Sequence, residues 1–242
     1  MIHFAEERWA QTRQVYDDWW EGRLSRPLIK SRVRCFDPGR PAPKAPLLSQ
    51  ENCHDFSYTP EEIVDAMDYA LSQYAFLGDA FPMVNFDSFG PGVLAAFCGA
   101  VLDNTSGRVW FFPPRNLPID RLHIRYDPEN RWVRRIKAIY RAGLDRWEGK
   151  VLMGMPDLGG VMDVIAAFRG SEELLMDLYD APEEVHRLRG EVYTAWMEAY
   201  RDLSACLEGN PGWSDWDGLY SDRPSYVLQS DFCYMISTPM FD

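Results

Sequence analysis

The sequence predicts a mixed α/β fold in which helices alternate with short, mostly parallel strands. The expected strands are largely apolar, as strands are when helices cover both faces of a parallel sheet. Segments with the 3.6-residue period of amphipathic helices separate them. Two of the strands also run into loops that carry aspartate and glycine. These observations place four strands at residues 28–33, 82–86, 151–155 and 226–229.

The first helix is expected over residues 5–21, because Trp9, Tyr16 and Trp20 fall on one face of it at helical spacing. Pro27 prevents the helix from continuing. The alternating segment that follows is the first of the four strands, and a proline-rich loop comes after it.

Three signals start the second helix at residue 59. Thr59 offers a hydroxyl as N-cap, Pro60 occupies the first helical position, and Glu62 stands three residues after the cap. The apolar stripe of this helix reaches Tyr74 and stops at Gly78. The apolar segment 82–86 then follows as the second strand.

The middle of the chain is expected to hold a loose hairpin between residues 108–112 and 122–126. Asp127 caps the next helix, whose apolar residues keep a 3.6-residue period as far as Trp147. Later, Ser171 caps a brief helix and Pro182 opens a long one.

Composition excludes several classes of function. Lys and Arg number 25 against 37 Asp and Glu, which gives a formal charge of −12. A surface this acidic repels phosphate backbones and anionic lipid, so neither nucleic acid nor a membrane is an expected partner. No apolar run reaches the ~18 residues of a membrane span, and the start of the chain lacks the order of a signal peptide. The five cysteines form no C-x-x-C pair, so we expect reduced thiols and a cytoplasmic protein.

The spacing of the four strands points to a decorated barrel. At about fifty to seventy residues it exceeds a minimal βαβ unit, so each crossover carries inserted loops and helices, as in (β/α)₈ barrel enzymes. Four strands are half of such a barrel, and residues 237–242 look like a proline-initiated helix just beginning. We therefore expect residues 1–242 to form one barrel domain that is incomplete at its C-terminus. A four-stranded open α/β sheet is the competing architecture.

Four segments resemble the uroporphyrinogen decarboxylase superfamily, which includes corrinoid-dependent methyltransferases. They are Gly90-Pro91-Gly92 through Gly99, Asp157-Leu158-Gly159-Gly160 through Gly170, Leu175 through Val185, and Gln229-Ser230-Asp231 through Phe241. Their order and spacing carry the resemblance, which covers most of the chain after residue 80. It implies a (β/α)₈ barrel of which this chain holds roughly the first half.

The resemblance also implies which chemistry is expected. Decarboxylases of the family have an arginine-rich R-Q-A-G-R motif that has no match here, and Ala166 stands where their tyrosine belongs. Without those arginines, binding of a polycarboxylate tetrapyrrole loses its strongest bonds. Corrinoid-dependent methyl transfer to a small substrate is therefore the leading expectation. Decarboxylation of a porphyrinogen or a smaller carboxylate is the alternative, and a non-catalytic binding subunit is a third.

Cofactors and partners follow from the same resemblance. The methyltransferase branch resembles a zinc enzyme with an H-x-C motif and a later cysteine, and those ligands would fall beyond residue 242. No metal site is identified within residues 1–242, and the cofactor is unknown. The expected ligand is a small molecule or a tetrapyrrole, with a corrinoid protein and a second copy of the chain as candidate partners.

Candidate site residues lie in the loops after the expected strands, because barrel active sites form at the C-terminal ends of the strands. Asp87 and Asp231 are the expected catalytic residues; the resemblance places Asp87 at the family's aspartate and Asp231 at or beside its serine. If two such carboxylates converge, their repulsion raises one pKa and provides a proton donor. The residues expected to bind substrate are Asp157, Tyr234, Arg34 and Arg169.

Overall fold

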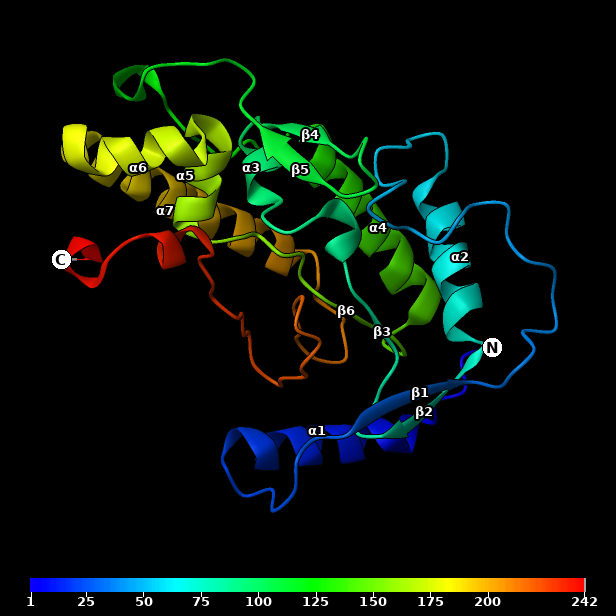
Figure 1. Ribbon diagram of the computed structural model, residues 1–242. Coiled ribbons are helices and arrows are strands. Elements are labelled where there is room, and N and C mark those ends of the chain that lie inside the picture. The colour runs from blue at the N-terminus through cyan, green and yellow to red at the C-terminus, as the bar shows by residue number, and fades with distance from the viewer. Residues whose placement is uncertain (242) are drawn as a thin grey trace. The chain divides into compact units, whose positions relative to one another are not determined.

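The computed structural model describes residues 1–241 (Figure 1). Their fold is mixed α/β, mostly helical with short sheets. The chain divides into two compact units, each built from three segments. Unit 1 comprises Met1–Ser88, Lys137–Met155 and Cys206–Val227, and unit 2 comprises Phe89–Ile136, Pro156–Ala205 and the chain from Leu228 onward.

Helix α1 (Glu6–Trp20) in unit 1 confirms the first predicted helix. Its buried residues Trp9 and Tyr16 pack with Phe81, Leu152 and Tyr220 in an aromatic-rich core cluster. The rings of Tyr16 and Phe81 meet edge to face, with centroids 5.6 Å apart, a favourable arrangement for aromatic pairs. The cluster thus joins all three chain segments of unit 1.

Helix α2 (Pro60–Leu71) begins as the sequence predicts. The backbone N–H of Glu62 donates to the Thr59 hydroxyl at 3.2 Å, and the backbone N–H of Thr59 donates to the Glu62 carboxylate at 2.8 Å. This capping box satisfies two N–H groups that a helix start leaves unpaired. The helix ends three residues before Tyr74, where the sequence prediction extended it.

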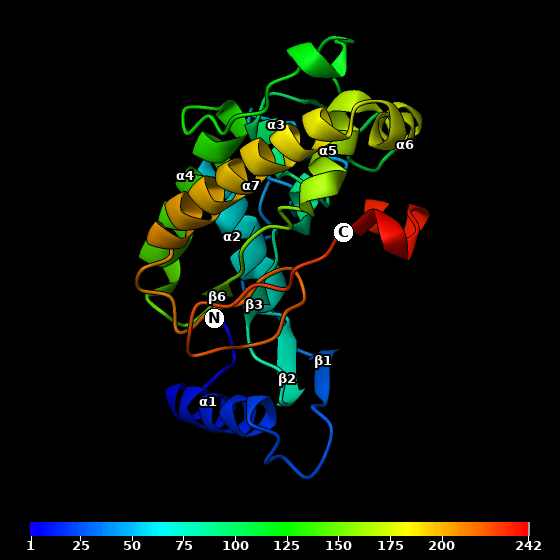
Figure 2. The ribbon, with the colours of Figure 1, turned by 90° about the vertical axis from the view of Figure 1, so that its left-hand side faces the viewer.

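Strands β1 (Lys30–Arg34) and β2 (Tyr74–Gly78) form an antiparallel pair, with Lys30 opposite Gly78 and Arg34 opposite Tyr74. They run side by side next to α1 in Figure 2, and Arg8 of α1 donates to the carbonyl of Gly78 at 3.0 Å. The prediction of residues 28–33 as a parallel barrel strand is therefore wrong. Its partner is β2, which includes Tyr74 from the predicted apolar stripe of the second helix.

Strands β3 (Met83–Val84) and β6 (Leu152–Met153) pair in parallel. The N–H of Leu152 donates to the carbonyl of Pro82, and the N–H of Gly154 donates to the carbonyl of Val84, both at 3.0 Å. This pair confirms two of the four predicted strands and their relative direction. Leu152 and Met153 are both buried, as expected for a strand covered on both faces.

The fourth predicted strand, residues 226–229, is absent. The N–H of Val227 donates to the carboxylate of Asp215 at 2.6 Å, so a side chain takes the place that a neighbouring strand would have. The strands within residues 1–241 form three two-stranded sheets. This part of the chain closes no barrel, and the competing four-stranded open sheet is not formed either.

The hairpin of unit 2 differs from the predicted one. Strand β4 (Val101–Asp103) pairs antiparallel with β5 (Trp110–Phe112), with Val101 opposite Phe112. Residues 122–126 form no strand. Instead the N–H of Ile124 donates to the Glu191 carboxylate at 2.9 Å. Short helices α3 (Leu94–Phe97) and η2 (Ile119–Arg121) lie on either side of the hairpin in the sequence.

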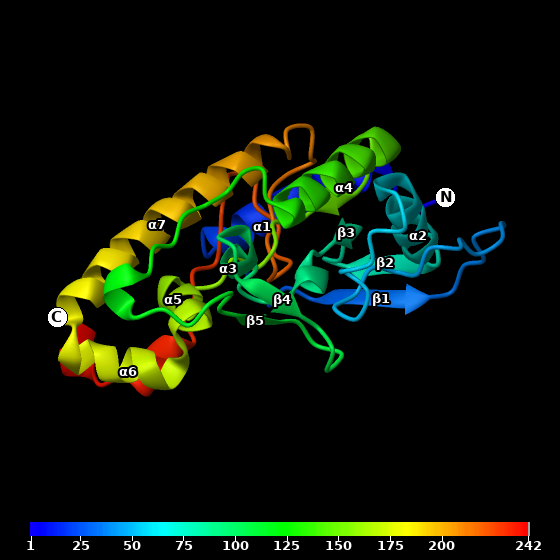
Figure 3. The ribbon, with the colours of Figure 1, turned by 90° about the horizontal axis from the view of Figure 1, so that it is seen from above.

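Three consecutive helices of unit 2 are α5 (Val161–Arg169), α6 (Ser171–Asp180) and α7 (Pro182–Ala205), and all three pack together (Figure 3). The long α7 confirms the prediction. The N-cap of α6 is Gly170, without a side-chain cap, so the predicted role of Ser171 as cap is wrong. The 3₁₀ turn η3 (Phe232–Met235) lies against α5, and η4 (Thr238–Phe241) follows it.

Helix α4 (Arg131–Trp147) was also predicted, with a different cap. The N–H of Trp132 donates to the Asn130 side chain at 2.9 Å, so Asn130 rather than Asp127 caps the helix. The remaining 3₁₀ turn, η1, spans Asp87–Phe89. Over residues 1–241, none of the helices is both long and apolar enough to cross a membrane.

Candidate functional site

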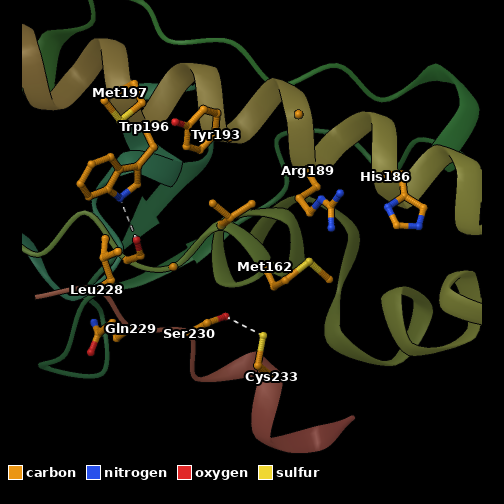
Figure 4. A pocket seen from close by; sticks show the side chains of 14 residues that line it. Met162, His186, Arg189, Tyr193, Trp196, Met197, Leu228, Gln229, Ser230 and Cys233 are labelled. Carbon is orange, nitrogen blue, oxygen red and sulfur yellow. Dashed lines mark hydrogen bonds between the residues drawn. The ribbon is translucent and has the colours of Figure 1, made fainter. Parts of the chain in front are cut away.

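A groove of about 780 Å³ lies within unit 2 (Figure 4). Three segments line it: residues 159–162 at the start of α5, one face of α7 from His186 to Met197, and residues 228–233. Its volume is within the range of sites for small organic molecules. Two of these segments, 159–162 and 228–233, belong to the motifs that carry the family resemblance.

Two glycines make the turn before α5. Gly159 has a φ of +78°, and a Cβ atom there would lie 2.6 Å from the Cα of Gly92. A Cβ at Gly160 would collide with the backbone carbonyl oxygen of Gln229. Neither position therefore accepts a side chain without a shift of the neighbouring backbone. Gly160 therefore allows the start of α5 to approach residues 229–230, and Gly159 allows it to approach Gly92.

Asp163 in the first turn of α5 binds the same two walls through its carboxylate. The N–H groups of Gly160 and Asp231 each donate to Oδ2 at 3.1 Å, and the N–H of Phe232 donates to Oδ1 at 2.6 Å. A carboxylate near a helix N-terminus is also favoured by the helix dipole. Asp163 thereby fixes the position of residues 228–233 relative to α5.

Asp157 is buried at the base of this arrangement, with 5% of its surface exposed. The Gln229 amide donates to both carboxylate oxygens, at 3.0 and 2.8 Å, and the N–H of Gly159 donates to Oδ1 at 2.8 Å. Burial raises the pKa of the Asp157 carboxyl, and the charge of Asp231 adds to the rise, while the bonds from Gly159 and Gln229 oppose it. The carboxylate is thus engaged by the walls of the groove.

Trp196 lines the apolar end of the groove. Its indole N–H donates to the carbonyl of Gly159 at 3.1 Å, which the dashed line in Figure 4 marks, and only 8% of its surface is exposed. Met162, Met197 and Leu228 line the groove as well. Thioether and indole groups provide a polarisable surface for an apolar ligand.

Polar groups line the rest of the groove. Ser230 Oγ and Cys233 Sγ lie 3.0 Å apart, within hydrogen-bonding distance. His186 and Arg189 extend from α7 on the side that faces Met162 (Figure 4). The site therefore combines an apolar surface with a thiol, an imidazole and a guanidinium.

The structure brings two of the predicted acids near one another. The Asp231 side chain is exposed, and its charge acts on the buried Asp157. The pKa of Asp157 is raised, in the direction expected when two carboxylates lie close together. Burial is the main cause of the rise, and the charge of Asp231 is a minor one. Asp87 belongs to unit 1, where its N–H donates to the Asn85 side chain at 2.7 Å and its side chain is exposed.

The other predicted residues lie outside the groove lining. Tyr234 in η3 is 84% exposed, whereas its neighbour Cys233 lines the groove. Arg169 donates two hydrogen bonds to the Asp177 carboxylate, from Nε at 2.6 Å and from a terminal nitrogen at 3.2 Å. Arg34 is exposed at the end of β1 in unit 1. The roles assigned to these residues from the sequence stay predictions.

Sequence reasoning missed the contribution of α7. The groove face of this helix repeats at helical spacing, through His186, Arg189, Tyr193 and Met197. Gly190 also lines it, and a glycine inside a long helix costs stability relative to alanine. A polar stripe that includes such a glycine was the signal available in the sequence.

Metal binding has no evident centre in this part of the chain. Within residues 1–241, no group of three or more His, Cys, Asp or Glu side chains is placed to hold a metal ion. The zinc ligands that the family resemblance implies would fall beyond residue 242, outside the described residues.

Comparison with known proteins gave a single kind of likeness. No protein-family model and no curated protein matches the sequence. Among solved structures, a methyltransferase from Methanosarcina mazei matches with a TM-score of 0.48 and 11% sequence identity. The match covers 69% of this chain and 53% of the other, so the chain spans about half the length of that structure.

Proposed function

We propose that this chain acts in corrinoid-dependent methyl transfer to a small substrate, as a relative of the uroporphyrinogen decarboxylase superfamily, and that the groove of unit 2 holds the substrate. The observation that carries the proposal is the meeting of two resemblance segments at the groove. Residues 157–163 and 229–231 are joined there by the bonds between Asp157 and Gln229 and between Asp163 and Asp231. The parallel pair β3–β6 supports the related proposal of a partial barrel.

The groove suits a reaction in which a nucleophile must lose its water shell. The apolar surface around Trp196 excludes water from a bound substrate, which strengthens the electrostatic interactions within the site. In methyl transfer, the substrate heteroatom forms a bond to the methyl carbon, the bond from that carbon to the donor breaks, and the donor keeps its electron pair. The proton of the substrate heteroatom must then leave.

The proposal assigns the acceptance of that proton to Asp231. It directly follows Ser230 of the groove lining, and its backbone N–H is fixed by Asp163 while its side chain stays exposed. A corrinoid would supply the methyl group as an external donor. No step is assigned to zinc, because the described residues offer no centre for it.

Methylcobalamin and a panel of small thiols test the proposal. We expect the purified chain to demethylate methylcobalamin in the presence of an accepted thiol, which the change in its visible absorbance reports. A Cβ at Gly190 would meet nothing within 4 Å. The side chain of Gly190→Leu should therefore extend into the groove and obstruct it without disturbing the fold. We expect at least a tenfold loss of rate in this variant.

The matched control is Ala205→Leu, which adds the same side chain at the exposed end of α7 outside the groove. Its rate should equal that of the unmodified chain. Absence of demethylation with every thiol, or equal rates in the two leucine variants, would contradict the proposal.

Decarboxylation is the second candidate, and one observation favours it. His186 and Arg189 line the groove, and cationic side chains of this kind bind carboxylates. A decarboxylase would release carbon dioxide from a small carboxylate without any methyl donor. Measuring carbon dioxide release and methylcobalamin loss on the same samples separates the two reactions.

A further inference from the structure

Two neighbouring arginines of helix α7, Arg187 and Arg189, differ in their contacts. Arg187 donates to the carboxylates of Glu184 and Glu191, at 2.7 Å each, and to the carbonyls of Ile119 and Leu122, at 2.9 Å each. Its position in the sequence explains this, because the two glutamates stand three residues before it and four after it. Arg187 is thus a structural residue that ties α7 to the loop around residues 119–122.

Arg189 is only two residues further along but lines the groove. Among residues 1–241 its guanidinium has no hydrogen-bond or ion-pair partner. No acidic residue is one helical turn away from it, since the residues at those positions are Val185, His186, Val192 and Tyr193. A charge left without a partner in a chain with a net charge of −12 marks a place where an anion is favoured.

His186 lies one turn before Arg189 on the same side of α7 (Figure 4). It too has no hydrogen-bond partner within the described part of the chain. An imidazole N–H beside a guanidinium gives an anion a second donor. At this end of the groove, Arg189 supplies a positive charge and His186 a second N–H donor.

The opposite end of the groove is apolar. Trp196 and Met197 lie two turns further along α7 than Arg189, and Leu228 faces them from the third segment (Figure 4). The indole N–H of Trp196 is already bonded to Gly159, so its ring offers an apolar face rather than a donor. The groove therefore has one end for a charge and one for an apolar body.

We propose that this groove binds a small organic anion. The negative group pairs with Arg189 and His186, and the apolar body lies against Trp196, Met197 and Leu228. The inference rests on the proposed use of the groove as the substrate site and names the chemical class of the substrate. A guanidinium with free donors binds a carboxylate, sulfonate or phosphate through two parallel bonds, which a neutral group of the same shape does not form.

Three probes that share a phenyl ring and an alkyl chain but differ in their terminal polar group test the inference. They are 4-phenylbutyrate, 4-phenylbutanol and 4-phenylbutylamine, with binding to the purified chain measured by calorimetry. We expect the anion to bind at least tenfold more tightly than the alcohol, and the amine most weakly. In Arg189→Gln the anion should lose that advantage while the affinity for the alcohol stays unchanged.

Two further variants locate the site. Gly190→Leu should abolish binding of all three probes, because its side chain obstructs the groove between Arg189 and Trp196. Arg201→Gln removes an exposed arginine of α7 outside the groove lining, and it should keep the preference for the anion. Urea unfolding of each variant shows that its fold is preserved.

The outcomes separate this inference from the proposed function. Equal binding of the three probes, or an anion preference that survives in Arg189→Gln, would overturn the anion site while leaving the groove as an apolar site. Probe binding that persists in Gly190→Leu, or no binding at all, would overturn it as well. The measurement needs no turnover, so a chain without methyl transfer activity still decides the question.

Discussion

Two aspartates of this chain, the buried Asp79 and the half-buried Asp163, accept hydrogen bonds from backbone N–H groups. Asp79 accepts the N–H of Ile29 at 2.7 Å and two bonds from Arg26 at 2.6 and 2.7 Å. Asp163 accepts three backbone N–H groups in the wall of the groove. Because a buried N–H without a partner is costly, each of these carboxylates fixes a loop that has no regular structure of its own.

The substitution Asp163→Asn tests this role. Asparagine keeps one acceptor oxygen and presents an NH₂ group to a backbone N–H, so at least one bond to Gly160, Asp231 or Phe232 is lost. We expect a loss of roughly 1–3 kcal/mol in the free energy of unfolding, measured with urea. Asp180→Asn, at an exposed position, should change it far less. Equal stability of the two variants would show that the carboxylate does not hold the wall.

Asp215 in unit 1 gives the stability a dependence on pH. It is 3% exposed, and burial followed by its bond with Asp217 raises its pKa to about 7. The folded chain therefore holds this proton more tightly than the unfolded chain does. The stabilising contribution is complete below the unfolded pKa and is lost as the pH rises to about 7, by an amount on the order of 4 kcal/mol.

Urea unfolding of the unmodified chain and of Asp215→Asn at pH 4, 5, 6, 7 and 8 checks this dependence. The unmodified chain should lose stability between pH 4 and 7, and the loss should be much smaller in Asp215→Asn. In Asp145→Asn, which changes an exposed residue of α4, the pH dependence should match that of the unmodified chain. The idea fails if Asp145→Asn and Asp215→Asn have parallel profiles.

At the level of elements, α7 combines a stabilising apolar face with a glycine that opens the groove. Gly190→Ala should stabilise the chain by about 0.5–1 kcal/mol, because alanine restricts the unfolded chain more and the added Cβ meets no neighbour. Thermal unfolding measures the gain. An unchanged or lower melting temperature would mean that the space above Gly190 is filled in solution.

The helices were predictable and most strand pairings were not. Capping and periodicity are local, so the Thr59 capping box and the start of α7 could be found from neighbouring residues alone. Pairing of β1 with β2 joins residues forty or more positions apart, and the apolar residues of β2 continue the stripe of α2. Residues 226–229 have the composition of a strand, yet the acceptor for Val227 is the Asp215 side chain.

The same limit applies to the candidate site, whose assigned roles stay predictions. Asp157 and Asp231 were singled out by their position after expected strands, and both lie beside the groove wall. The bonds from Gln229 to Asp157 span 72 residues, and no local pattern shows that they engage this carboxylate. No sequence motif surrounds Arg189. That it lines a groove without a hydrogen-bond partner can be seen only in the folded structure.

For the molecule as a whole, the order of segments within each unit has a consequence for folding. The core cluster of unit 1 draws Trp9 and Tyr16 from the first segment, Leu152 from the second and Tyr220 from the third. In the same unit, Asp68 accepts a bond from Arg146 at 3.1 Å and one from the Trp147 indole at 3.2 Å. The first 88 residues thus depend on partners far along the chain.

A fragment of residues 1–88 should therefore not fold on its own. It lacks the Leu152 and Tyr220 side chains of the core cluster, the β6 partner of β3 and the bonds from Arg146 and Trp147 to Asp68. Burying a side chain of this size contributes about 1.5–3 kcal/mol to the free energy of unfolding. The loss of two such side chains is therefore comparable to a large part of the stability of a small domain. We expect no cooperative urea transition and no near-ultraviolet circular dichroism from the fragment, whereas the full chain shows both. A sharp transition in the fragment would mean that α1, α2 and the β1–β2 pair hold their structure without the rest of unit 1.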